Sequence, residues 1–257
     1  MLHKALSAVP GVEMHHEYAV QITQPLAVKR YLGALDEAET RKLLDDTFGA
    51  AVRHARTSHW GDSSNKLSWL ISDLAALFPE ARFVHLVRDG RKVASSYFHK
   101  LGDENYDDRS NAVLQNWYDG KSAAPPPEKP YWWPVPRRGD PMAEDFCRFD
   151  QFQRICWHWA EINRVALAAL AALPLDRTLF VRLEDLTGSP ALVRTLYDFL
   201  GLPFCDSDFA VFARPHNVNK PEDRLLDARQ TAQFQALAGA VMAQLGYAGT
   251  PEYAVNY

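Results

Sequence analysis

Two short apolar runs, each followed by a loop and a helix, constrain the fold more than any other feature of this sequence. Residues 83–87, FVHLV, and residues 179–183, LFVRL, are almost continuously apolar, which is typical of strands covered on both faces in a parallel sheet. The second run leads to Ser189-Pro190, a helix cap and first turn, and Gly201 ends that helix. Two such strand-loop-helix units predict an α/β fold.

Other apolar stripes at helical spacing predict three more helices. They cover residues 64–78, residues 150–173 and the stretch after the capping box of Asp227 and Gln230. Pro79 and Gly246 end the first and the last of these helices. The alternation of strands and helices predicts a three-layer architecture, with a mostly parallel sheet and helices on both of its faces.

Length and composition limit the class of protein. A chain of 257 residues with 47% hydrophobic content supports one sizeable core, so we expect a single domain over residues 1–257. A net charge of −4 argues against a nucleic-acid partner, because backbone phosphates require a broad basic surface. No apolar run reaches about 18 residues, so no membrane span is expected. Three cysteines without C-x-x-C spacing and the lack of a secretion signal favour a cytoplasmic location.

A proline-rich and aromatic segment interrupts the regular pattern. Residues 120–141 carry seven prolines together with Tyr131, Trp132 and Trp133, and we place them in an insertion or lid at about residues 101–150. The segment is a lid or a linker. Adjacent tryptophans favour burial, so we prefer an ordered loop on the substrate side.

Basic residues surround the junction after the first apolar run, in RDGRKVASSYFHK. Arg88 ends the strand, at the edge where α/β sheets bind ligands. Lys92, Ser96 and Lys100 recur every four residues and share one helix face. These donors suit a phosphate, and Asp89 or a bound anion would offset the charges in the first helical turn. A solvated basic face explains the spacing equally well.

The sequence of this stretch resembles the 3′-phosphate-binding motif of the sulfotransferase family, which uses 3′-phosphoadenosine-5′-phosphosulfate (PAPS) as donor. The family has an arginine at the strand end and a serine eight residues later, and Arg88 and Ser96 match these positions. VRDGR most resembles the tyrosylprotein and bacterial branches, in which a basic residue twelve positions after the arginine also contributes, and Lys100 matches it. WGDSSNKLSWL, CWHWAEINR and FVRLEDLTGSPALVRTLYDFLGLPF are similar to further family segments.

The resemblance implies a fold of P-loop NTPase type, PAPS as co-substrate, and Arg88, Ser96 and Lys100 as cofactor-binding residues. It implies transfer of a sulfuryl group to a hydroxyl or amine, with no metal. Glu17, in HHEY, matches the position of the family's general base. His16 and a solvated loop end are the alternatives for this position, and three consecutive residues such as 15–17 cannot converge on one metal ion.

One family element is not visible in these residues. The family holds the 5′-phosphosulfate with a loop of the type G-x-x-[RK]-[ST]-G-[ST]-[ST] after its first strand, and no such sequence occurs here. MLHKALSAVPGVEMHHEY resembles the family segment immediately after that loop, so we expect the natural protein to start about 15–25 residues earlier, the length of one strand and one loop. A rearranged edge or a non-catalytic relative that binds PAPS or its product are the alternatives.

The acceptor is open at this stage. A carbohydrate, a lipid, a peptide tyrosine or another small molecule all fit, and Tyr131, Trp132 and Trp133 are our candidates for the acceptor wall. Trp60, Asp62, Asn65 and Lys66 are expected at another edge of the site, near adenine or ribose. We expect Trp157 and Trp159 to pack in the core, because they lie on a long helix whose apolar stripe includes Trp159.

Overall fold

The computed structural model describes residues 1–100, 105–127, 129–213 and 225–252, without the side chain of Lys100. The first part of the chain contains α1 (Leu2–Leu6), β1 (Val12–His16), α2 (Val20–Tyr31), α3 (Glu37–Leu44), the π-helix η1 (Asp45–Gly49), α4 (Ala50–Arg53), β2 (His59–Ser63), the 3₁₀ helix η2 (Asn65–Leu70) and α5 (Ile71–Leu77). The middle contains β3 (Phe83–Val87), α6 (Gly90–Lys100), α7 (Asp108–Tyr118), η3 (Lys129–Tyr131), α8 (Ala143–Phe146) and α9 (Gln151–Ala171). The last part contains η4 (Leu175–Arg177), β4 (Thr178–Arg182), α10 (Leu183–Gly188), α11 (Pro190–Leu200), η5 (Asp206–Asp208), α12 (Phe209–Phe212) and α13 (Ala228–Gln244).

All four described strands pair in parallel, which confirms the predicted α/β class. β1 pairs with β2, with Val12 opposite His59, and β3 pairs with β4, with Phe83 opposite Thr178. The strands form two separate two-stranded sheets rather than the one sheet expected from the sequence. Each described strand therefore has one hydrogen-bonded neighbour, because no ladder joins β2 to β3 within the described ranges.

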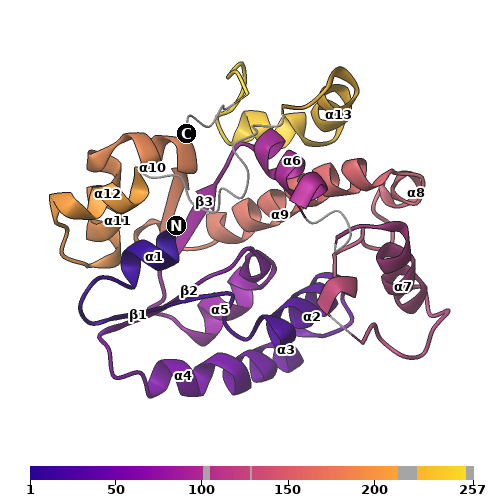
Figure 1. Cartoon of the computed structure of the whole chain (residues 1–257). Coiled ribbons are helices and arrows are strands. Elements are labelled where there is room, and N and C mark those ends of the chain that lie inside the picture. The colour runs from indigo at the N-terminus through magenta and orange to yellow at the C-terminus, as the bar shows by residue number, and fades with distance from the viewer. Residues whose placement is uncertain (101–104, 128, 214–224, 253–257) are drawn as a thin grey trace.

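Helices cover both faces of these strands. The long helix α9 crosses the middle of the molecule, with α6 and α13 packed on one side of it and α5 on another (Figure 1). Side chains of β3 alternate between two apolar clusters, because successive residues of a strand point to opposite faces. Phe83 and Val87 pack into the larger cluster, and Val84 and Leu86 pack into the smaller one.

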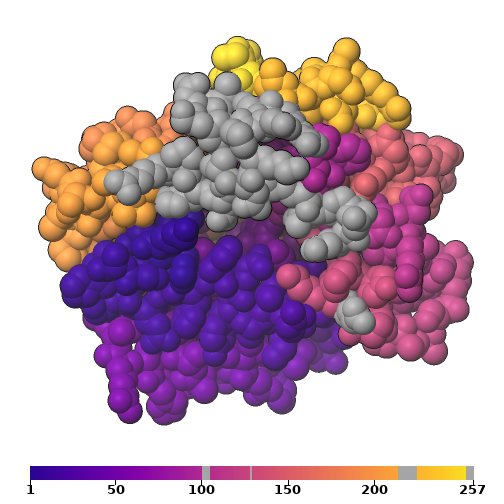
Figure 2. All heavy atoms as spheres, viewed as in Figure 1, coloured from indigo at the N-terminus to yellow at the C-terminus, as the bar shows by residue number. Residues whose placement is uncertain are grey.

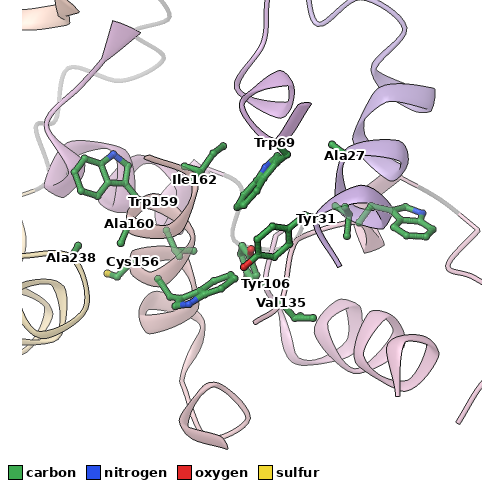
Figure 3. Packing of buried hydrophobic residues seen from close by; sticks show 14 of the residues in the cluster. Ala27, Tyr31, Trp69, Tyr106, Val135, Cys156, Trp159, Ala160, Ile162 and Ala238 are labelled. Carbon is green, nitrogen blue, oxygen red and sulfur yellow. The ribbon is translucent and has the colours of Figure 1, made fainter. Parts of the chain in front are cut away.

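The larger cluster joins α2, α5, α6, α9 and α13, and the smaller one joins α1, α10, α11 and α12. Figure 3 shows Tyr31, Trp69 and Tyr106 directed toward one another in the larger cluster, where the rings of Tyr31 and Trp69 are 4.5 Å apart. On the surface shown in Figure 2, the first quarter of the chain forms the lower left of the molecule and α13 lies at its upper right. None of the described helices has the length and apolar character needed to cross a bilayer.

Local sequence signals explain most element boundaries. The predicted caps are confirmed: the side chain of Asp227 accepts from the backbone of Gln230 in a capping box, and Ser189 caps α11, which ends at left-handed Gly201. The helix expected over residues 64–78 is divided, because its first turns are the 3₁₀ helix η2, capped by Ser64. The α-helical part begins only at Ile71.

Candidate active site

The loop after β1 places Glu17 in a backbone conformation that residues with a side chain rarely adopt. Glu17 has a φ of 57° and Ala19 a φ of 48°, in the left-handed region. Such a conformation costs about 1–3 kcal/mol and concentrates at functional sites. The backbone N–H of Glu17 donates to the carbonyl of Ser63 at 3.3 Å, which ties the loop to the end of β2. Glu17 therefore lies where β1 and β2 both end.

The carboxylate of Glu17 forms an ion pair with the ammonium group of Lys66, which donates a short hydrogen bond to Oε1. Both side chains are mostly buried, with 24% of Glu17 and 13% of Lys66 exposed. Burial alone raises the pKa of Glu17, but the hydrogen bond and charge of Lys66 outweigh it, so the pKa lies below its ordinary value. Glu17 is thus ionised at neutral pH and can accept a proton.

A small aromatic pocket of about 10 Å³, room for about one water molecule, lies next to this ion pair. Lys66 lines it, and its ammonium group is 6.0 Å from the ring centre of Trp133. The other walls come from α2, η2, α9 and the proline-rich segment, through Gln24, Trp69, Trp132, Pro134 and His158. The segment predicted as a substrate-side loop therefore supplies a pocket wall through Trp132 and Trp133, whereas Tyr131 does not line the pocket.

Hydrogen bonds between buried groups hold that wall in place. The amide of Gln24 donates to the carbonyl of Trp132 at 2.8 Å. The hydroxyl of Tyr106 donates to the carbonyl of Pro134 at 2.7 Å and lies 3.0 Å from Nδ1 of His158. Burial lowers the pKa of His158 to about 3, so this imidazole is neutral at physiological pH. It serves as a fixed hydrogen-bonding group rather than as a charge.

Asn65 connects this pocket to helix α6. Its side-chain amide donates to the hydroxyl of Tyr97 at 2.9 Å, and the ring of Tyr97 lies 6.1 Å from that of Trp133. Burial raises the pKa of Tyr97 to about 12, and the charge of Glu17 also raises it. Tyr97 directly follows Ser96, so the middle of the predicted phosphate-binding helix lies beside the Glu17 pocket.

The turn between β3 and α6 is largely buried. Asp89 is 1% exposed, and its carboxylate accepts from the backbone and the guanidinium group of Arg91. The charge of Arg91 in the first helical turn is thus offset by Asp89, as predicted. Arg91 also donates to the carbonyls of Thr250 and Pro251, which brings the C-terminal segment onto this turn.

Lys92, also buried at 4% exposure, lies 3.3 Å from a carboxylate oxygen of Glu252. The sequence predicts that Lys92 shares the phosphate-binding face of α6, and in the structure it already faces an anion of the C-terminal segment.

Arg88 and Ser96 are half-buried and bracket this turn. Nε of Arg88 is buried and has no hydrogen-bond partner in the described part of the chain, so it is a donor that suits an anionic ligand. The residues present therefore fit a phosphate group. The side chain of Lys100 lies outside the described residues, and its role stays a prediction.

The neighbouring polar side chains His15, His16 and Asp62 each contact a different partner. His15 lies 2.9 Å from a carboxylate oxygen of Glu13, and His16 lies 2.8 Å from the carbonyl of Ser63. Asp62 accepts from the backbone of Tyr18 at 3.1 Å, and burial raises its pKa. Within the described ranges, no group of three His, Cys, Asp or Glu side chains is placed to hold a metal ion.

The tryptophans of α9 and β2 belong to the core. Trp157 and Trp159 are buried, as expected from the helix stripe, and Trp60 packs against the larger cluster. The indole ring of Trp60 lies 5.0 Å from the ring of His15. None of these three residues lines the aromatic pocket.

Sequence reasoning placed Lys66 near the nucleotide and missed its ion pair with Glu17. The two residues are 49 positions apart, and only the parallel pairing of β1 with β2 brings them together. The signal was present, because both come after the carboxyl end of a strand, where side chains of a parallel sheet converge. The contacts of Arg91 and Lys92 with residues 250–252 had no such signal.

Comparison with known proteins gives matches to two family profiles. Residues 2–124 match a profile described as "Sulfotransferase family", and residues 69–246 match one described as "Sulfotransferase domain". No curated protein matches the chain. Among solved structures, the chain is similar to the "Sulfotransferase Domain from the Curacin Biosynthetic Pathway", with 14% identity, a TM-score of 0.42, and coverage of 96% of this chain and 94% of that one.

Proposed function

The chain belongs to the sulfotransferase family, and we propose on that premise that it transfers a sulfuryl group from PAPS to a hydroxyl or amine of an acceptor. The observation that carries this proposal is the buried pair of Glu17 and Lys66 beside an aromatic pocket. The bond from Asn65 to Tyr97 joins that pocket to α6, the helix that carries Ser96 and begins two residues after Arg88. A base and an anion-binding helix thus border one site.

Each residue has a separate role in the proposed reaction. Arg88 and Ser96 bind the 3′-phosphate, and Lys100 assists them. Glu17 takes the proton of the acceptor, which lies against the half-buried ring of Trp133, as general bases do. A bond forms between the acceptor atom and sulfur, and the bond between sulfur and the bridging oxygen breaks. The products are the sulfated acceptor and adenosine 3′,5′-bisphosphate.

In the proposed reaction Lys66 interacts first with Glu17 and then with the sulfuryl group. In the structure its ammonium group neutralises Glu17. An arriving sulfuryl group offers Lys66 an alternative anion, so the carboxylate becomes a stronger base when the donor is in place. Positioning and charge neutralisation dominate such in-line transfers, and cationic side chains supply the positive charge. The proposed mechanism therefore requires no metal.

Substitution of Arg88 tests the phosphate site. We expect Arg88→Ala to weaken the binding of adenosine 3′,5′-bisphosphate by about 1.5–3 kcal/mol, the scale of a hydrogen bond to a charged group. Isothermal titration calorimetry measures this loss. Arg148→Ala, at a side chain that is 72% exposed and distant in sequence, is the matched control and should leave the affinity unchanged. Equal affinities for Arg88→Ala and the wild type would refute the assignment.

Substitution of Glu17 tests the base. We expect Glu17→Gln to reduce turnover about 100-fold or more, because an amide cannot accept the proton. Its affinity for adenosine 3′,5′-bisphosphate should stay at the wild-type value. Wild-type turnover in this variant would assign proton removal to another group, with His16 as the next candidate.

A second candidate is a protein that binds PAPS or its product without transferring sulfate. Such a protein would keep the phosphate-binding role of Arg88 and Ser96 and lack the transfer step. A transfer assay with ³⁵S-labelled PAPS separates the two. Binding of adenosine 3′,5′-bisphosphate without transfer to any acceptor of a broad panel would favour the binding protein.

The same panel addresses the acceptor, which we propose to be a small molecule, carbohydrate, lipid or peptide rather than a nucleic acid. Trp69 and Trp132 are buried, whereas the ring of Trp133 at the edge of the pocket is half-buried and favours an acceptor with an apolar or aromatic face beside the reacting group. We also propose a cytoplasmic location, since Cys147, Cys156 and Cys205 are all free thiols. A relation to the tyrosylprotein and bacterial branches is part of the proposal.

A further inference from the structure

A carboxylate at the end of β4 lies directly beside the turn after Arg88. β3 ends at Val87 and β4 ends at Arg182, and these two residues are opposite each other in the parallel register. Asp89 and Glu184 each come two residues after those ends, so they emerge at the same edge of the sheet. The side chain of Glu184 is therefore close to the turn between β3 and α6.

Glu184 uses both of its oxygens there. Oε1 accepts the backbone N–H of Asp89 at 2.8 Å, and Oε2 accepts the hydroxyl of Tyr247 at 2.7 Å. Tyr247 is 6% exposed, and burial together with its bond to Glu184 raises its pKa, so its hydroxyl stays protonated and donates. One carboxylate thus joins β3, α10 and the chain after α13.

The bond to Asp89 fixes the peptide unit immediately after Arg88. The N–H that Glu184 accepts belongs to the peptide bond between Arg88 and Asp89. Anchoring that bond fixes the backbone from which the guanidinium group of Arg88 extends. Arg88 itself has a buried Nε without a hydrogen-bond partner in the described part of the chain, so no bond of Nε sets its direction.

We propose that Glu184 is a positioning residue for nucleotide recognition, which orients Arg88 toward the 3′-phosphate through the Asp89 peptide and is itself held by Tyr247. This inference rests on the proposed function, because it needs Arg88 to bind that phosphate. Hydrogen bonds that preorganise a ligand-binding group reduce the cost of ordering it when the ligand arrives. Glu184 does not touch the ligand in this role.

Because Glu184 is negatively charged, a positioning role and a direct electrostatic effect on the ligand predict opposite results. A carboxylate near an anionic ligand weakens binding, so a purely electrostatic effect predicts tighter binding once the charge is removed. A positioning role predicts the opposite for Glu184→Ala, which loses both hydrogen bonds. Glu184→Gln keeps an acceptor for Asp89 and a polar partner for Tyr247, so it should preserve function.

The experiment compares two ligands by calorimetry, adenosine 3′,5′-bisphosphate and adenosine 5′-phosphate, which lacks the 3′-phosphate. We expect Glu184→Ala to weaken the binding of adenosine 3′,5′-bisphosphate about tenfold and to leave the affinity for adenosine 5′-phosphate unchanged. The reason is that a misdirected Arg88 loses contact only with the 3′-phosphate, which adenosine 5′-phosphate lacks. Glu184→Gln should stay within about threefold of the wild type. In an Arg88→Ala background, Glu184→Ala should cause no further loss. Glu144→Ala, at an exposed carboxylate of α8, is the control.

One additional variant keeps the test decisive. If Glu184→Ala does not fold, Tyr247→Phe removes the bond to Oε2, together with a longer contact of 3.5 Å from the same hydroxyl to the carbonyl of Val87. It should show a smaller loss, about threefold, with the same preference between ligands. Equal losses for both nucleotides, or a loss that persists without Arg88, would overturn the positioning role. If Arg88→Ala itself has no effect, the phosphate site fails. If Arg88→Ala weakens binding and Glu184→Ala does not, only the role of Glu184 fails.

Discussion

A strained residue and a buried ion pair define the chemistry at the scale of single residues. Glu17 is held in the left-handed region and paired with Lys66. A strained backbone and a buried ion pair both carry a free-energy cost, and such features concentrate at functional sites. A carboxylate in this position is ionised but weakly basic until its partner is drawn away. In the proposed reaction, the pair would link proton removal by Glu17 to the arrival of a second anion at Lys66.

Replacement of Lys66 should change the pH dependence of the reaction. In Lys66→Met the carboxylate of Glu17 loses the partner that lowers its pKa and keeps the burial that raises it. The acidic limb of kcat/KM, which falls as Glu17 becomes protonated, should therefore move to higher pH. Lys42→Met, which removes an exposed pair with Asp46, should leave that limb in place. An unmoved limb in Lys66→Met would show that Glu17 is not the titrating base.

The left-handed backbone at position 17 should be visible in stability measurements. Glycine adopts this conformation without strain, so Glu17→Gly should be about 1 kcal/mol more stable than Glu17→Ala in urea denaturation. At His16, which has an extended backbone in β1, the order should reverse, because glycine weakens a strand. A glycine variant at position 17 that is no more stable than the alanine variant would contradict the strain argument.

At the scale of elements, the start of α6 depends on a glycine whose importance the sequence did not reveal. A Cβ at Gly90 would lie 2.6 Å from Cζ of Phe234 and 2.6 Å from Cε2 of Trp159. Helices α9 and α13 therefore approach α6 so closely that only glycine fits. The reason for glycine at this position is therefore packing between three helices.

We expect Gly90→Ala to destabilise the protein by about 1–3 kcal/mol, the usual cost of overpacking a core. The movement of α6 that makes room for the added Cβ should also displace Arg88 and weaken the binding of adenosine 3′,5′-bisphosphate. Thermal denaturation and calorimetry measure the two effects. Gly188→Ala is the matched control, because a Cβ there meets no atom within 4 Å. Equal stability of the two variants would show that the helices can separate without cost.

At the scale of the whole molecule, two apolar clusters lie on opposite faces of β3 and should unfold together. All seven tryptophans belong to the larger cluster or pack against it, and the smaller cluster contains none. Tryptophan fluorescence therefore reports on one cluster only. Because β3 contributes side chains to both, we propose that residues 1–257 form one cooperative domain.

This proposal is tested by a mutation in the cluster without tryptophan. Leu196 is fully buried in the smaller cluster, so Leu196→Ala should reduce stability by about 2–5 kcal/mol. For a single domain, the urea midpoint measured by tryptophan fluorescence falls as far as the midpoint measured by far-ultraviolet circular dichroism. A fluorescence midpoint that does not move would mean that the clusters unfold independently. Leu192→Ala, at an exposed position of the same helix, should change neither midpoint by much.

The sequence by itself determined the local features: the apolar runs that became β3 and β4, and the caps of α11 and α13. These depend on side-chain periodicity and backbone preferences, which act over a few residues. Only the tertiary structure decided which distant groups meet. Lys66 reaches Glu17, Glu184 reaches the peptide after Arg88, and the C-terminal segment reaches Arg91, because strand pairing and helix packing join residues far apart in the chain. No local pattern encodes such contacts, since each partner satisfies its local rules without the other.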